Sequence, residues 1–143
     1  MNRIHAIALA VSTLLVVSPA AKAADLTVTV KDVRNATGAV LIAVYDESSF
    51  GKPELAKAKQ KANAGNGEVK FVFHNLPAGK YAVSACHDEN GNGKLDRNSF
   101  GVPTEGYGFS NDAQGTAGPP KFVQAAFDFD GKTNKTISFS LNY

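Results

Sequence analysis

Apolar and polar residues alternate along several short segments of the chain, which is the pattern of β-strands that bury one face. The alternation is clearest in residues 26–30 and 68–74, and residues 39–45 form a nearly continuous apolar run. Val, Ile, Phe and Tyr are frequent in these segments, and Gly, Asn or Pro separates them. We therefore predict strands here and in the segments that share these features: residues 80–87, 125–129 and 136–141.

At least six short strands with turns between them are typical of an all-β sandwich. A turn at residues 35–38 predicts that the strands at 26–33 and 39–45 form a hairpin. Residues 52–62 predict a short surface helix instead, because Pro53 suits the first turn and Glu54 suits the positive end of the helix dipole.

One long stretch, residues 88–124, interrupts this pattern. It contains seven glycines and three prolines and shows little periodicity. Loops of this length in a compact domain are usually functional or disordered. Disordered segments are poor in aromatic residues, whereas this one carries Phe100, Tyr107, Phe109 and Phe122. We therefore expect an ordered loop whose aromatic side chains pack on the sandwich or line a binding site.

The first 23 residues have the three parts of a secretory signal peptide. Arg3 is followed by an apolar stretch at residues 6–17, and Ala21-Lys22-Ala23 is a small-residue cleavage pattern. The apolar stretch is shorter than the roughly 20 residues that span a bilayer. We predict a single mature domain of residues 24–143, periplasmic or secreted, with no membrane insertion after cleavage.

The charge of the chain depends on this leader. The full chain has 15 basic and 13 acidic residues and a formal net charge of +2. Removing residues 1–23 takes away Arg3 and Lys22 and no acidic residue, so the mature chain has no net charge. No basic patch indicates nucleic acid as a partner. The single cysteine, Cys86, cannot form an internal disulfide, and its apolar surroundings predict a buried strand position, with a reactive thiol or an intermolecular bridge as alternatives.

Residues 88–96 carry the most specific motif of the chain, D-x-N-x-N-G-x-x-D. Calcium is bound by six to eight oxygen atoms, and such loops supply them from alternate positions. Gly93 occupies the sixth position, where the chain turns sharply. The predicted ligands are four side chains and one backbone carbonyl: Asp88, Asn90, Asn92, Lys94 (carbonyl) and Asp96.

The loop differs from an EF-hand. Ser99 stands at the twelfth position, where an EF-hand has a bidentate Glu, and a strand precedes the loop. Only two of the predicted ligand side chains are charged, so we expect a dissociation constant on the order of 10⁻⁴ to 10⁻³ M. Glu105 is a possible additional ligand, as is Asp112 or a backbone carbonyl of the long loop.

Other interpretations of these residues remain open. Asn and Gly are also common turn formers, so the loop could be a polar turn without an ion. Adjacent strands could bring His74 and His87 together with Asp88 as a zinc or copper site. His87, Tyr107 and Phe109 could form a binding surface. No catalytic residue is predicted, because no spacing enforces the geometry of an acid–base pair.

Two parts of the sequence resemble known families. Residues 73–83, which contain Leu76-Pro77-Ala78-Gly79-Lys80-Tyr81, resemble the strand–turn–strand of transthyretin-like and Cna-B-like sandwich modules. Residues 87–96 and 101–111 are similar to a bacterial exported family catalogued as domain of unknown function 2141. The resemblance implies export and a sandwich of about seven strands, and it brings no activity, substrate or catalytic residue.

The expected fold is therefore all-β, a single immunoglobulin-like or transthyretin-like antiparallel β-sandwich with one short helix and a long ordered loop. The expected function is an exported, non-enzymatic binding module in which a calcium-binding loop orders a surface that recognises an unknown protein or carbohydrate. The first alternative is a metal-free adhesion module that binds carbohydrate or protein through Tyr107 and Phe109. The second is a small periplasmic enzyme that uses His87 and Asp88.

Overall fold

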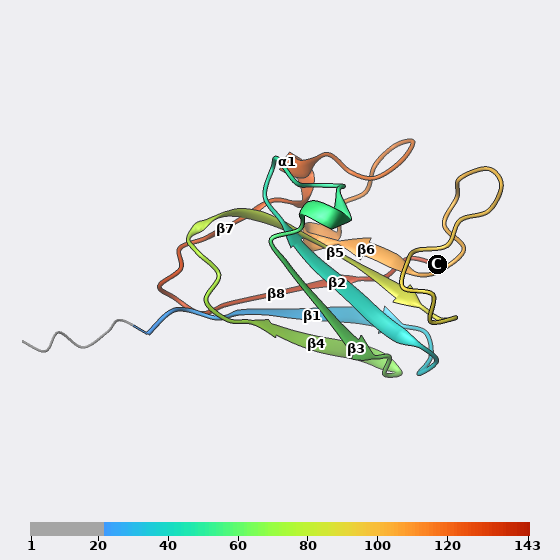
Figure 1. Cartoon of the computed structure of the whole chain (residues 1–143), viewed down its shortest axis with the longest axis horizontal. Helices are drawn as coiled ribbons and strands as arrows, with labels where there is room; N and C mark the ends of the chain where they lie inside the picture. The colour runs from blue at the N-terminus through green and yellow to red at the C-terminus, as the bar shows by residue number, and fades with distance from the viewer. Residues whose placement is uncertain (1–21) are drawn as a thin grey trace, which may run out of the picture.

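Two β-sheets pack face to face in the computed structural model, which describes residues 22–143 (Figure 1). The smaller sheet has the strand order β4-β1-β8, and the larger has the order β3-β2-β5-β6, with β7 also pairing with β5. The strands are β1 (Leu26–Val33), β2 (Ala39–Tyr45), β3 (Ala58–Asn63), β4 (Gly67–Phe73), β5 (Gly79–Asp88), β6 (Tyr107–Phe109), β7 (Phe127–Phe129) and β8 (Lys135–Ser140). The predicted all-β sandwich is confirmed.

The core lies between the two sheets and is built by the alternation seen in the sequence. Leu26, Val28 and Val30 of β1 are completely buried, while the residues between them are half-buried. In the opposite sheet, Val83 of β5 is also completely buried. Phe139 of β8, which lies in the same sheet as β1, is the largest completely buried side chain. Each strand therefore turns one face to the core and the other outward.

The predicted hairpin between the first two strands is wrong. β1 pairs with β4 in antiparallel and with β8 in parallel orientation, and β2 pairs with β3 and β5. Residues 34–38 therefore carry the chain from one sheet to the other. The physical reason is that both strands have an apolar face, and placing them in opposite sheets buries the two faces against each other. The β1–β8 pair also makes the sandwich not entirely antiparallel.

The predicted helix at residues 52–62 is also wrong. Only Pro53–Leu55 forms a 3₁₀ turn, and β3 follows as an edge strand of the larger sheet. In β3, Ala58, Gln60 and Ala62 are half-buried while the residues between them are exposed. The inward-facing residues of β3 are small or polar, so their alternation with the exposed residues gives only a weak apolar pattern. Helix propensity therefore dominated the sequence-based prediction. Exposed lysines on an edge strand also discourage pairing with another chain.

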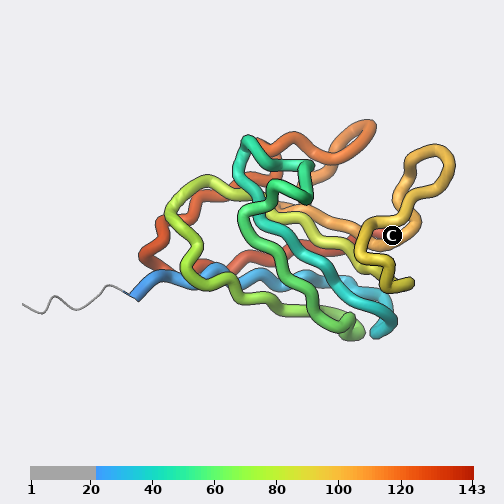
Figure 2. The backbone as a smooth tube through the Cα atoms, in the orientation of Figure 1, coloured from blue at the N-terminus to red at the C-terminus, as the bar shows by residue number. Residues whose placement is uncertain are grey.

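The long loop is ordered, as predicted, and contains short elements of its own. These are β6, a 3₁₀ turn at Ser110–Asp112 and a short α-helix, α1 (Phe122–Ala125). The predicted strand at 125–129 therefore begins later, at Phe127. Two parts of this loop project from the body of the sandwich as separate hairpin-like excursions, coloured orange and yellow-orange in Figure 2.

The predicted signal peptide lies almost entirely outside the described residues, so it stays a prediction. Within residues 22–143 no helix is both long enough and apolar enough to pass through a membrane.

Candidate metal centre

The end of β5 positions the first residue of the candidate loop. Asp88 lies opposite Ala39 of β2 in the sheet register, and its side chain is completely buried. Its Oδ1 accepts the backbone N–H groups of Gly91 at 2.9 Å and Asn92 at 3.1 Å, and its Oδ2 accepts that of Gly93 at 2.8 Å. The loop is thus wrapped around the Asp88 carboxylate, which satisfies three backbone donors.

The two glycines permit this wrapping. Gly91 has φ +76° and Gly93 has φ +81°, both in the left-handed region that a residue without a Cβ enters at little cost. The position of Gly93 in the motif led to the same expectation from sequence.

The other predicted side-chain ligands converge on Asp96. Asn92 Nδ2 lies 2.8 Å from both carboxylate oxygens of Asp96, and Asn90 Nδ2 lies 2.5 Å from its Oδ2. These hydrogen bonds from Asn92 and Asn90 hold the pKa of Asp96 below its usual value. The side chains at motif positions 3, 5 and 9 therefore meet at one point, with position 1 beneath them.

Glu105, the possible additional ligand, also has a structural role that the sequence did not predict. Its side chain is buried, and its Oε1 and Oε2 accept the backbone N–H groups of Glu89 and Asp96, each at 3.0 Å. One carboxylate thus joins the beginning and the end of the loop. Glu105 therefore holds the two ends of the loop together, and the lone pairs of its carboxylate that accept no hydrogen bond could still bind an ion.

Several oxygen atoms remain able to bind a cation. A carboxylate has about four lone-pair positions, and the protein occupies three on Asp88. The Asn90 and Asn92 side-chain oxygens accept the backbone N–H groups of Asn92 and Lys94, each at 3.1 Å, and each oxygen keeps a second lone pair that a cation could use. Among residues 22–143 no three His, Cys, Asp or Glu side chains are grouped closely enough to hold a metal. A cation here would therefore rely on amide, carbonyl and water oxygens besides carboxylates, which calcium accepts.

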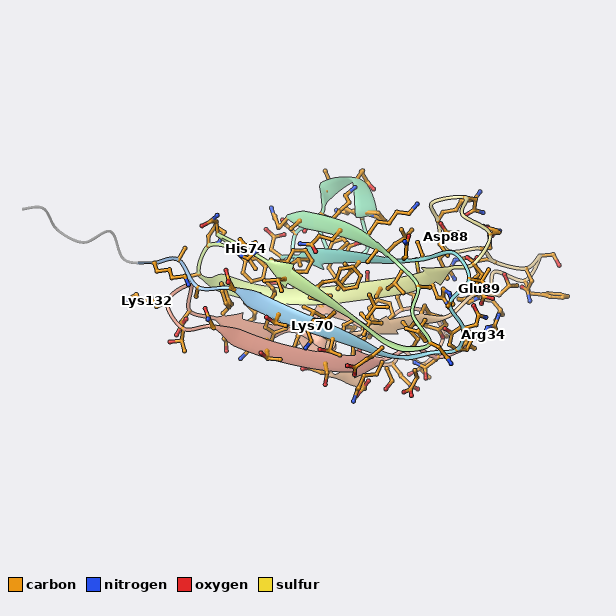
Figure 3. All side chains as sticks on the ribbon, turned by 90° about the horizontal axis from the view of Figure 1, so that it is seen from below. Arg34, Lys70, His74, Asp88, Glu89 and Lys132 are labelled. Atoms are coloured by element: carbon orange, nitrogen blue, oxygen red, sulfur yellow. The ribbon has the colours of Figure 1, made fainter. Side chains whose placement is uncertain are left out.

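The two histidines do not form a metal site. His74 Nδ1 lies 2.7 Å from Asp25 Oδ1, and Figure 3 shows His74 at the opposite end of the sandwich from Asp88. β4 and β5 lie in different sheets, so the strands that end at the two histidines are not neighbours. The alternative of a metal site shared by His74 and His87 is therefore wrong.

His87 is a structural residue and not part of a contact surface. Its side chain is completely buried. Nε2 lies 2.7 Å from the carbonyl oxygen of Thr37, which can only accept, so Nε2 donates. Nδ1 lies 2.8 Å from Tyr143 Oη, and this hydroxyl accepts the Arg34 backbone N–H. The imidazole thereby links β5 to the turn after β1 and to the last residue.

Arg34 and Glu89 were not found by sequence reasoning. The Arg34 guanidinium lies 2.5 Å from Glu89 Oε1 without well-oriented hydrogen-bond geometry, and Asn35 Nδ2 donates to Oε2 at 3.3 Å. Burial raises the pKa of Glu89, but Asn35 and Arg34 outweigh it and the net shift is downward. The Arg34 guanidinium also lies over the Tyr143 ring, 4.4 Å from its centroid. The 54-residue separation of Asn35 and Glu89 left no local signal for this pairing.

Three of the aromatic residues of the long loop, Tyr107, Phe109 and Phe122, lie on one outer face of the larger sheet, whereas Phe100 is exposed. Phe50 is at the centre, with edge-to-face contacts to Tyr45 at 5.9 Å, Phe109 at 6.0 Å and Phe122 at 5.7 Å between ring centroids. This agrees with the expectation that these rings order the loop. Such pairs contribute beyond the burial of their area.

Tyr107 and Phe109, the two other predicted contact residues, are only half-buried. They line a cavity of about 130 Å³ together with part of the orange excursion seen in Figure 2: Gln114, Gly115 and Pro120. This cavity is separate in its lining from the Asp88–Asp96 loop.

Cys86 lies on the same outer face, between Leu41 and Tyr107 in the sheet register, and is half-buried instead of fully buried. Burial, with the charges of Glu105 and Asp88, raises the pKa of its thiol to about 12. Because the thiolate is the nucleophile, the thiol is unreactive at neutral pH. We expect a disulfide reagent at pH 8 to modify the folded protein at least tenfold more slowly than the urea-unfolded chain. Equal rates would contradict this placement.

Comparison with known proteins places the chain in a family. No curated protein and no solved structure matches it, so the likeness to transthyretin-like and Cna-B-like modules has no structural counterpart. A family model described as "Uncharacterized protein conserved in bacteria (DUF2141)" matches residues 28–138, which include every strand in part or whole. The matched range also contains the whole candidate loop with Glu105. The chain belongs to the bacterial family DUF2141.

Proposed function

We propose that this protein is a non-enzymatic binding module in which residues 88–96 bind calcium and hold the adjoining surface in a fixed shape for recognition of a protein or carbohydrate. The observation that carries the proposal is the convergence of the Asn90 and Asn92 side chains on Asp96, above the buried Asp88 carboxylate. A simple polar turn does not need three motif side chains to meet at one point.

The charges of the segment support a cation. Asp88, Glu89, Asp96 and Glu105 are acidic, whereas only Lys94 and Arg97 are basic between residues 88 and 105. The Glu89 charge is already offset by the ion pair with a residue outside the segment. A divalent cation would offset the remaining excess and replace amide hydrogen bonds to Asp96 by shorter ion contacts.

We also infer export, from the leader pattern of residues 1–23, and a transthyretin-like arrangement of the sandwich. The turn that carries the second resemblance has a supporting contact, since Tyr81 Oη donates to the Pro77 carbonyl at 2.8 Å. Burial raises the pKa of the Tyr81 hydroxyl, so it remains a donor at all physiological pH values. This contact fixes the corner between β4 and β5.

Calcium should raise the melting temperature of residues 24–143. With a dissociation constant of about 10⁻³ M, about 10 mM calcium stabilises the native state by about 1.4 kcal/mol. For a domain of this size, that is about 5 °C. We expect Asp96→Asn to abolish most of the rise, because it removes a charged ligand while keeping an oxygen that accepts from the neighbouring amides.

Asp130→Asn is the matched control. Asp130 also accepts two backbone N–H groups in an exposed turn, at 2.8 Å from Lys132 and Thr133, but it lies outside the loop. It should keep the full calcium-dependent rise. A wild-type melting temperature that is the same in calcium and in excess chelator, or an equal rise in both variants, would refute the proposal.

A metal-free binding module is the second candidate, and the cavity beside Tyr107 and Phe109 favours it. About 130 Å³ is small beside the 300–1,000 Å³ of drug-sized pockets, so it suits one sugar ring or one side chain of a partner. Aromatic faces stack on such groups. Under this alternative, ligand binding is unchanged by chelator.

A further inference from the structure

The hairpin that follows the candidate loop, residues 96–104, projects from the sandwich and is rigidly built (Figures 1 and 2). At its base the Thr104 N–H donates to the Asp96 carbonyl at 2.9 Å, and Arg97 and Pro103 form an antiparallel bridge. Glu105 holds the base from beneath through the Asp96 N–H. We call residues 100–102 of this hairpin the apolar tip.

The apolar tip exposes two large hydrophobic side chains. Phe100 is 88% exposed and Val102 is 55% exposed, and no other large hydrophobic residue among those described is more exposed than Phe100. The other aromatic residues of the long loop pack on the sandwich, so Phe100 is the exception. A protruding apolar side chain on an ordered support marks a surface that is covered by something else.

The backbone N–H groups of the apolar tip are hydrogen-bonded within the hairpin itself. Asn98 Oδ1 accepts the N–H groups of Phe100 at 2.9 Å and Val102 at 3.1 Å, and the Asn98 carbonyl accepts that of Gly101 at 2.9 Å. The Val102 carbonyl accepts the Asn98 N–H at 2.9 Å, and the Gly101 carbonyl accepts from Arg97 at 2.9 Å. All three N–H groups of the tip are thus bonded within the hairpin. Such a tip can leave water without stranding its N–H donors, which meets the donor half of the requirement that a lipid medium imposes, and the Phe100 carbonyl would stay at the level of the polar headgroups.

The charges beside the tip are cationic. Between residues 88 and 105 the exposed charged side chains are Lys94 and Arg97, whereas the four acidic side chains are buried or half-buried in or beside the candidate loop: Asp88, Glu89, Asp96 and Glu105. Arg97 reaches the tip itself through the Gly101 carbonyl. This arrangement of apolar side chains at the extremity with cations behind them matches an anionic phospholipid surface, where acyl chains lie beneath negative headgroups.

We propose that the apolar tip inserts into the interface of an anionic phospholipid membrane, with Phe100 and Val102 among the upper acyl chains and Arg97 at the headgroups. The inference goes beyond the proposed calcium module and does not need calcium. Two side chains provide weak, reversible attachment and not an anchor. The docked protein would hold its sandwich away from the membrane, with the candidate loop at the surface.

A tryptophan reporter tests the proposal directly, because the chain contains no Trp. Phe100→Trp in residues 24–143 is mixed with vesicles of phosphatidylglycerol and phosphatidylethanolamine at millimolar lipid, in chelator. We expect a blue shift of the emission and quenching by lipids brominated in the upper acyl chain. Leu55→Trp is the control, since Leu55 is 51% exposed but lies on the 3₁₀ turn before β3. It should show neither change.

A second variant separates insertion from simple electrostatic adsorption. Val102→Ser in the Phe100→Trp background should weaken vesicle binding several-fold at unchanged melting temperature, because the residue is exposed and its N–H keeps its acceptor. An unshifted Phe100→Trp spectrum at saturating lipid overturns the proposal, as does equal binding with and without the Val102→Ser change. Emission that shifts only with a soluble protein partner would also overturn it. A failure of the calcium experiments leaves these outcomes unaffected, since they are measured in chelator.

Discussion

Replacing Gly38 with alanine is expected to lower the free energy of unfolding by about 3 kcal/mol or more. Gly38 has φ +72°, and a Cβ built on it would lie 2.1 Å from the carbonyl oxygen of Asp88. Real Cβ atoms do not approach a backbone oxygen so closely, so the end of β5 would have to move. Because this carbonyl begins the candidate loop, Gly38→Ala should also weaken calcium binding.

Gly51→Ala separates the steric effect from backbone strain. Gly51 has φ +78°, but a Cβ there would meet no atom within 4 Å. Its replacement should therefore cost only the left-handed conformation of a residue with a side chain, about 1–2 kcal/mol. Chemical denaturation of both variants measures the difference. Equal losses would show that the close approach of Gly38 to Asp88 does not exist in solution.

Asp88→Ala is expected to destabilise the protein by about 2–4 kcal/mol in chelator as well as in calcium. The reason is that the buried carboxylate satisfies three backbone donors whether or not an ion is present. Hydrogen bonds to a charged group are among the stronger ones in proteins. Asp88→Ala cannot therefore distinguish an ion site from a turn, whereas Asp96→Asn can.

Asp130→Ala provides the comparison for this second prediction as well. Asp130 accepts two backbone N–H groups but is exposed, so water replaces the carboxylate and the loss should stay below about 1 kcal/mol. Urea unfolding of the two variants in chelator gives the two values. A loss for Asp88→Ala as small as that for Asp130→Ala would mean that the loop is not wrapped around the Asp88 carboxylate.

Alternation in the sequence was sufficient to predict most strands. It worked for β1 and β4 because their apolar residues are large and recur with a period of two. It failed for β3, where Ala58, Gln60 and Ala62 face inward between lysines. Strand pairing was less predictable still, since the turn at residues 35–38 has the composition of a hairpin but carries the chain between the sheets.

The site was predictable where its residues are close in sequence. The motif placed Asn90, Asn92 and Asp96 together and required a glycine between them, and the structure agrees. The contacts around it were not predictable, because they come from distant parts of the chain. Arg34 and Glu89 form an ion pair although they follow strands of different sheets. The buried His87 is hydrogen-bonded to Tyr143, which is 56 positions away.

The long loop shows a third kind of limit. Its aromatic content correctly indicated order, yet the same content could not separate packed rings from exposed ones. Phe109 and Phe122 are held by Phe50, which precedes them by more than fifty residues. Phe100 has the same side chain and remains exposed because the Asn98 hydrogen bonds close the hairpin before it can reach the sheet.

A calcium titration of residues 24–143, followed by the backbone amide NMR signals, tests the central claim most directly. The proposal predicts saturable shifts of the amides in residues 88–96 with a dissociation constant of about 10⁻⁴ to 10⁻³ M, while the amides of β1 and β8 stay unchanged. The Gly93 amide, which donates to Asp88 Oδ2, should be among those that move. Amide signals in the loop that do not change up to about 10 mM calcium would contradict the claim and leave residues 88–96 as a structural turn.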